Sequence, residues 1–362
     1  MSARDARTGP ARDRAVTGGR RQGAATSRPE RAPTGNVRSA ARRDAGPARP
    51  PAASAAVDGL VVGTVPPLAR LAGVLLLLAG VAGAAAPFPT YLVVDGQPLS
   101  QATGVGSALI ALLVPLTYLA VGAGLARGSV PKFGLAYAGV AGALAVGQLL
   151  IEVYRGSSST SRPGVEVLAG QRVLTSGVEV AAGWVLGLAA LGLAVLAGGC
   201  AAAAWGRTVM EDEGGLDPTR AGLAGAAVLL AVGTVLCLAL PAADVPDRLV
   251  TDPATGMQTV VTREGPQALL ERPGLALLGG LLLAGAVVLC SVVAPSLRPR
   301  LAAVGGLLAI AVSVLDAGLL GARDAQGSPD LRWTLPGIGL VLAGLAYVGL
   351  TALAWRVRRE RP

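Results

Sequence analysis

The chain has 362 residues, of which 52% are hydrophobic and 15% are charged, and its 31 basic and 22 acidic side chains give a net charge of +9. Soluble domains carry about 25% charged residues, so this deficit indicates a protein that faces lipid. Histidine is absent, which excludes histidine-based metal centres, axial haem histidines, Ser-His triads and histidine proton relays. We therefore expect no enzymatic activity, no metal site and no cofactor.

Residues 1–66 differ in composition from the rest of the chain. They hold twelve Arg and five acidic residues, and most of the remainder is Ala, Gly, Pro, Ser and Thr. Such a segment cannot bury enough apolar surface to offset its chain entropy, so we predict a disordered cytoplasmic tail. Two roles stay open for this tail. It is either an arm that binds anionic lipid headgroups or an acidic partner, or a solvated segment whose charge fixes the topology.

Residues 67–355 are predicted to form an all-α membrane domain, an eight-helix transmembrane bundle. A bilayer core needs about twenty apolar residues per helix, and a backbone in lipid must satisfy its own hydrogen bonds. The predicted spans are 68–88, 105–126, 133–153, 181–205, 221–241, 273–295, 301–321 and 335–355. The three cysteines lie inside spans, where we expect them to pack as small apolar side chains.

The basic residues predict how these spans are oriented. Arg and Lys concentrate in the tail, in the connections that follow the second, fourth and sixth spans, and in residues 356–362. The other connections are longer and balance Arg with Asp and Glu. The positive-inside rule therefore places both termini in the cytoplasm, with 356–362 as a basic cytoplasmic C-terminus. Together with the Ala-, Gly- and Arg-rich composition, this indicates a multi-pass protein of a bacterial plasma membrane.

Three of the outer loops carry a hairpin pattern, at residues 91–99, 165–174 and 248–261. In each loop two short apolar runs flank turn residues, of which Asp95-Gly96 is the clearest pair. The fourth loop, with Gly327-Ser328-Pro329, is predicted to be irregular. Each pair of spans with its loop resembles the next pair, so we expect four hairpin repeats that start near residues 67, 133, 220 and 301. The hairpins either join into one small sheet that caps the bundle or remain separate loops.

Few polar residues lie within or beside the spans, and five of them form the candidate site: Asp316, Gln148, Glu152, Thr117 and Tyr118. Ionisable groups inside a bilayer are usually functional. Asp316, about a turn and a half from the outer end of its span, has two interpretations. It binds a cation or proton in a transport path, or it is an interfacial carboxylate that reaches outer water. Glu152 is interpreted as an acid at a loop edge, and Pro115 is expected to kink the second span.

The paired spans, the small outer hairpins and the Arg-rich tail resemble uncharacterised multi-pass membrane proteins of actinobacterial type. This resemblance covers the whole chain and is one of architecture and composition. No motif carries it, so it assigns no functional residue.

The scarcity of intramembrane polar residues favours a non-enzymatic accessory or scaffolding component of the cell envelope. A transporter or permease for a small or lipidic solute is the alternative, because internal repeats are frequent in transporters. The expected partners are the lipid bilayer, anionic lipid at the tail, and another membrane protein or a second copy of the chain. No nucleic-acid partner is expected. A cavity lined by the candidate residues favours transport, and a bundle packed solid through its centre favours the scaffold.

Overall fold

The structure is a computed structural model. It describes residues 60–94, 96–157, 165–168, 171–174, 177–212, 219–246, 248–251, 258–261, 269, 272, 274–327 and 331–356. The predictions for residues 1–59 and 357–362 lie outside the described residues.

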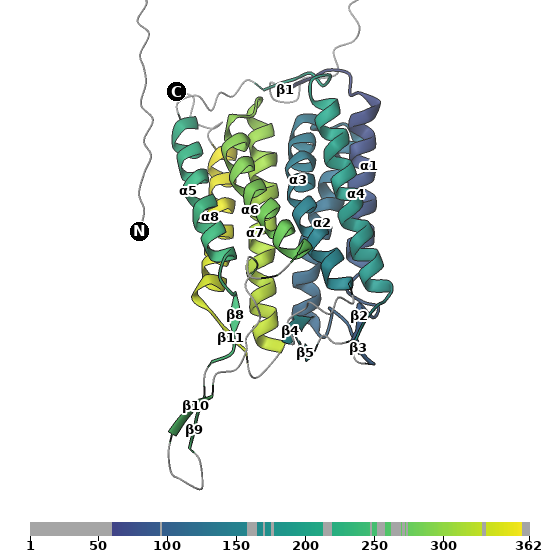
Figure 1. The fold of residues 1–362 in the computed structure, drawn as a ribbon. Helices are drawn as coiled ribbons and strands as arrows, with labels where there is room; N and C mark the ends of the chain where they lie inside the picture. The colour runs from purple at the N-terminus through teal and green to yellow at the C-terminus, as the bar shows by residue number, and fades with distance from the viewer. Residues whose placement is uncertain are drawn as a thin grey trace, which may run out of the picture. The chain divides into compact units, whose positions relative to one another are not determined.

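The eight predicted spans are confirmed within the described part of the chain, which holds eight helices long and apolar enough to cross a membrane. Figure 1 shows them as one bundle. Their bounds are α1 Pro67–Ala85, α2 Val105–Arg127, α3 Pro131–Gly156, α4 Ala182–Trp205, α5 Arg220–Leu238, α6 Leu275–Val293, α7 Arg300–Gly327 and α8 Leu335–Arg356. A 3-10 turn, Ala294–Ser296, extends α6. The main departure is α7, which continues six residues beyond its predicted end at residue 321.

The short connection between α2 and α3 shows how the sequence sets these boundaries. Gly128 ends α2 in the left-handed conformation, with φ of 73°, and its N–H donates to the carbonyl groups of Gly124 and Leu125. Only glycine adopts this conformation without steric cost. Pro131 then occupies the first turn of α3, where its fixed φ suits a helix and its missing N–H leaves no bond unmade.

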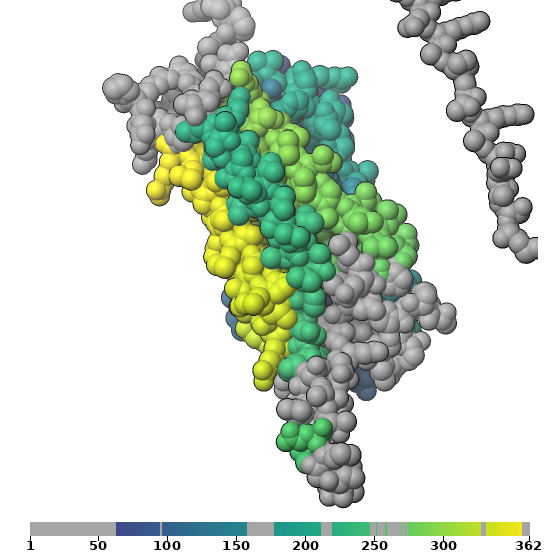
Figure 2. All heavy atoms as spheres, turned by 60° about the vertical axis from the view of Figure 1, so that its left-hand side comes forward, coloured from purple at the N-terminus to yellow at the C-terminus, as the bar shows by residue number. Residues whose placement is uncertain are grey.

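Helices α3 and α7 form the centre of the bundle. In their most apolar stretches 67% and 61% of the residues are buried, against 22–39% in the other six helices. Helix α3 packs against α4, α6 and α7, and α7 packs against α8, α3 and α2. The remaining helices surround this pair and present apolar side chains outward. Helices α5 and α8 lie side by side on the face seen in Figure 2.

Glycines allow the central helices to approach their neighbours closely. A Cβ at Gly142 of α3 would lie 2.8 Å from the Gly198 Cα of α4. A Cβ at Gly147 would lie 2.6 Å from the Gly279 carbonyl oxygen of α6. Because lipid is as apolar as the helices, such close van der Waals packing drives helix association in a membrane.

The predicted hairpins are confirmed, but the single cap sheet is wrong for the strands that the structure describes. The hairpins are β2 Leu92–Val94 with β3 Gln97–Leu99, β4 Val165–Leu168 with β5 Gln171–Leu174, and β9 Arg248–Thr251 with β10 Gln258–Val261. They do not pair with one another. Instead β2 also pairs with β6 Val178–Val180, which directly precedes α4. We call this end of the bundle the sheet end.

Two further strand pairs were not predicted. In the fourth loop, predicted to be irregular, β11 Arg332–Trp333 pairs with β8 Ala243–Asp244 at the sheet end. At the opposite end, which carries the α2–α3 turn and which we call the turn end, β1 Leu60–Val62 pairs with β7 Met210–Asp212. Strand β1 lies in the predicted disordered tail, and that expectation is wrong from residue 60 onward. A strand this short depends on a distant partner, which local composition does not reveal.

Replacing Gly147 with leucine should push α3 away from α6, because no side chain fits between their backbones. Overpacking of this kind costs about 1–3 kcal/mol. The free energy of unfolding in detergent micelles measures this loss. Gly139 of the same helix is the matched control, since a Cβ there meets no atom within 4 Å. Equal destabilisation by Gly139→Leu and Gly147→Leu would contradict the close α3–α6 contact.

Candidate functional site

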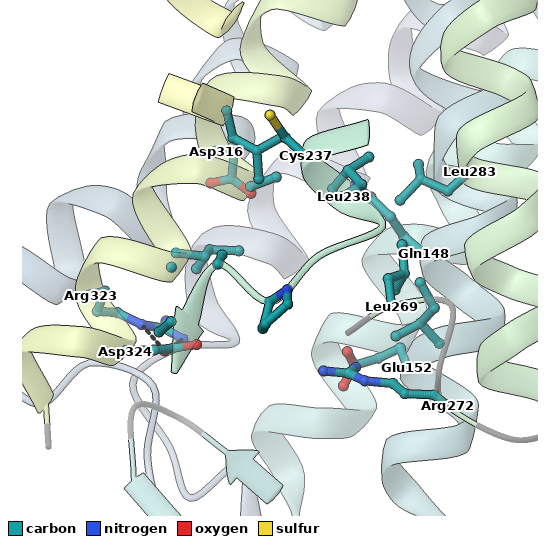
Figure 3. Close-up of a pocket in the computed structure, with 18 of the residues that line it drawn as sticks. Gln148, Glu152, Cys237, Leu238, Leu269, Arg272, Leu283, Asp316, Arg323 and Asp324 are labelled. Atoms are coloured by element: carbon teal, nitrogen blue, oxygen red, sulfur yellow. Dashed lines mark hydrogen bonds and ion pairs between the residues drawn. The ribbon is translucent and has the colours of Figure 1, made fainter. Parts of the chain in front are cut away.

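A cavity of 380 Å³ lies between the two central helices at the sheet end of the bundle. Helices α3 and α7 form facing walls. The rest of the lining comes from the end of α5 and the residues after it, from α4, α6 and α8, and from Gln101, Leu269 and Arg272. Figure 3 shows polar side chains from both walls directed toward the cavity. The polar and charged lining residues are Gln101, Gln148, Glu152, Arg155, Arg272, Asp316, Arg323 and Asp324. Three of the five predicted site residues therefore meet here.

On the α3 wall, Glu152 is held by partners from other parts of the chain. Its carboxylate accepts a hydrogen bond from the Tyr91 hydroxyl and an ion pair from Arg155, with 3.2 Å between Nη1 and Oε2. The Trp184 indole N–H donates to the Glu152 backbone carbonyl at 2.9 Å. Glu152 is 7% exposed. It is thus a buried, fixed carboxylate, and its interpretation as a loop-edge acid is wrong.

On the α7 wall, Arg323 and Asp324 form a second ion pair, with 3.0 Å between Nη2 and Oδ1. Asp324 also interacts electrostatically with Arg155 and Arg272, and Arg272 interacts with Glu152. The charges near the cavity mouth therefore belong to one network of three arginines and two carboxylates. Buried or half-buried charges need such compensation.

Gln148 and Asp316 lie deeper, on facing walls. Neither side chain has a hydrogen bond or ion pair with another described residue. Asp316 is directed into the cavity beside Cys237, as Figure 3 shows. It lies eleven residues before the end of α7 at Gly327, about 16 Å along the helix axis. The carboxylate is thus farther from this end of its helix than the predicted turn and a half, because α7 is longer than its apolar run.

The other two predicted residues, Thr117 and Tyr118, do not line the cavity. The Thr117 hydroxyl lies 2.7 Å from the Tyr137 hydroxyl and donates to the Val114 carbonyl at the same distance. Tyr118 packs its ring edge-on against Tyr137, with 6.2 Å between ring centroids. These side chains join α2 to α3 within the core.

The sequence prediction missed the arginines of the site, because it placed them in loops. The predicted third span ends before Arg155 and the predicted seventh span ends before Arg323, yet both arginines lie within helices. A signal was present: Arg155 follows Gln148 by seven residues, and Arg323 follows Asp316 by seven. Two helical turns separate such residues, so each pair lies on one face.

The cavity is amphipathic. Leu238, Leu269 and Leu283 contribute apolar lining close to Gln148 (Figure 3). Cys237 is the lining thiol, and the chain has no histidine to pair with it. Among the described residues no group of three or more Cys, Asp and Glu is arranged to hold a metal ion. The arrangement suits reversible binding of a small polar molecule.

Comparison of the chain with family models, curated proteins and solved structures gives no match.

Replacing Tyr91 with phenylalanine should destabilise the protein by about 1–3 kcal/mol, because the buried Glu152 carboxylate loses a donor. Thermal or denaturant unfolding in detergent measures the change. Tyr118→Phe is the control: its hydroxyl makes no hydrogen bond with a described residue, and we expect a change below about 0.5 kcal/mol. Combining Tyr91→Phe with Glu152→Gln should cost less than the sum of the single changes. Strict additivity would contradict the contact.

Proposed function

We propose that this integral membrane protein is a permease-type transporter whose cavity binds a small polar solute, with no catalytic role. The observation that carries the proposal is the position of Gln148 and Asp316. Two polar side chains that make no hydrogen bond or ion pair with another described residue face one cavity from the two central helices. Polar groups at membrane depth are costly and usually mark a substrate or ion pathway.

Matching positions on α3 and α7 support a duplicated architecture. Gln148 follows Pro131 by seventeen residues, and Asp316 follows Pro299 by seventeen. A basic residue directly follows each proline, and an arginine follows each polar residue seven positions later. The residues on the two cavity walls therefore share one spacing.

The contacts between helices repeat in the same way. Helix α1 packs against α2 and α4, as α5 packs against α6 and α8. Helix α3 packs against α4 and α6, as α7 packs against α8 and α2. Strand β6, before α4, pairs with β2 after α1, and β11, before α8, pairs with β8 after α5. We therefore propose two repeats of four helices, 67–205 and 220–356, in place of the four hairpin repeats expected from the sequence.

A basic residue and a tryptophan join the central and last helix of each repeat. Lys132, at the start of α3, lies 5.1 Å from the ring centroid of Trp205 at the end of α4. Arg300, at the start of α7, donates to the Trp355 backbone carbonyl near the end of α8 at 3.2 Å. These contacts hold α3 against α4 and α7 against α8 at the turn end.

Two repeats that run in the same direction are related by an axis along the membrane normal, and transporters with such repeats bind their solutes at the repeat interface. The cavity lies at this interface, between α3 and α7. With the basic turn end in the cytoplasm of a bacterial plasma membrane, the cavity faces the outside. A scaffolding protein, the function favoured by the sequence, requires no such cavity.

Cysteine labelling tests this proposal, because Cys237 lines the cavity whereas Cys200 and Cys290 do not. In a Cys200→Ala/Cys290→Ala variant, a membrane-impermeant cationic methanethiosulfonate should modify Cys237 in right-side-out vesicles. It should also modify Cys237 in inverted vesicles, since a transporter exposes its binding site to both sides in turn. Mass spectrometry of the intact protein measures the modified fraction.

A Cys237→Ala/Cys290→Ala variant, which keeps only Cys200, is the matched control and should stay unmodified in both vesicle types. Modification of Cys237 from one side alone would contradict transport and favour a scaffold with an outer binding pocket. Absence of modification from both sides would show that the cavity is closed to water.

A further inference from the structure

Building on the proposed function, we propose that Asp316 and Gln148 form a binding site for one monovalent cation. The cation is either an alkali ion or an ammonium group carried by the solute. Both present a single positive charge to a carboxylate and an amide oxygen.

The surroundings of Asp316 favour the binding of a positively charged group. Cys237 lies beside it in Figure 3, and Ala317, Leu320 and Leu340 also line the cavity; none of these side chains donates a strong hydrogen bond. An ionised carboxylate away from water is strongly unfavourable unless a cation or a donor compensates it. Arg323 and Tyr118 interact with Asp316 electrostatically, but no described residue makes a hydrogen bond or an ion pair with its carboxylate.

The arginines near the cavity mouth interact with acids nearer to them than Asp316. Arg323 is on the same helix as Asp316, seven residues or about 10 Å along the axis, and its guanidinium bonds Asp324. Arg155 bonds Glu152. Arg272 interacts electrostatically with Glu152 and Asp324. Each of the two ion pairs is neutral, so Arg155 and Arg323 each have a carboxylate partner closer than Asp316, and Arg272 adds one positive charge at the mouth.

The number of carboxylates favours a monovalent over a divalent cation. Calcium takes six to eight oxygen ligands, several of them carboxylates, and magnesium takes about six at strict geometry. The deep part of this cavity offers one carboxylate and one amide oxygen. One positive charge neutralises Asp316, whereas two would leave an uncompensated charge inside the membrane.

The experiment measures the unfolding midpoint of the full chain in detergent from the fluorescence of its four tryptophans. Sodium, potassium and methylammonium chloride are compared with N-methyl-D-glucamine chloride at equal ionic strength. At least one of the three cations should raise the midpoint in a saturable way. Sodium or potassium would identify an alkali ion, and methylammonium alone would identify an ammonium group on the solute.

Asp316→Asn should weaken the apparent affinity by at least about tenfold. It should not lower the midpoint in the reference salt, because the Asp316 carboxylate makes no hydrogen bond or ion pair with a described residue that the change would break. Asp324→Asn, on the same helix, is the matched control and should keep the cation response. The exchanged variant Gln148→Asp/Asp316→Gln should also bind the cation, since it restores the pair across the cavity.

A second readout requires no change at Asp316. The stabilising cation should slow modification of Cys237 in the variant that keeps only this cysteine. A midpoint insensitive to all three cations, a response that survives Asp316→Asn, or one that the exchanged variant loses would overturn the cation site. Labelling of Cys237 from both membrane faces would still support transport in each of these cases, so the two proposals fail independently.

Discussion

Close contact between helix backbones is the constraint on which this structure depends. In water, burial of apolar surface holds helices together, but in lipid each apolar helix face is already solvated by chains of similar polarity. Association then requires small residues at the contacts. Helix α3 supplies Gly142 toward α4 and Gly147 toward α6, and α7 supplies Gly318 and α8 supplies Gly344 to their shared contact. The two central helices can therefore be surrounded by neighbours on several sides.

The pairing of α3 with α7 also explains where the cavity lies. Near the turn end the backbones touch, because a Cβ at Gly305 would overlap the carbonyl of Phe133. Toward the sheet end the two helices carry Glu152, Arg155, Arg323 and Asp324, whose bulk and charge do not allow such contact. The ion pairs hold these side chains along their own walls. The same helix pair is thus closed at one end and open at the other.

The sequence predicted most of the fold and part of the site. Eight apolar runs, and turn pairs such as Asp95-Gly96, are local signals, so the spans and hairpins followed from them. Asp316, Gln148 and Glu152 were found because polar groups are rare in spans. Arg155 and Arg323 were not found, because hydropathy ends a helix where its apolar run ends. The strand pairs β1–β7 and β8–β11 join residues far apart in the sequence, which no local pattern reports.

The accessibility of α7 to water tests the central claim, that α3 and α7 are closed at the turn end and enclose a polar cavity at the sheet end. Single cysteines can be placed along residues 305–323 in a chain free of native cysteine, and their rates of reaction with a membrane-impermeant thiol reagent compared. We expect fast reaction at Asp316→Cys and Leu320→Cys and slow reaction at Gly306→Cys and Ala309→Cys. Equal rates along the whole helix, or slow reaction at every position, would contradict it.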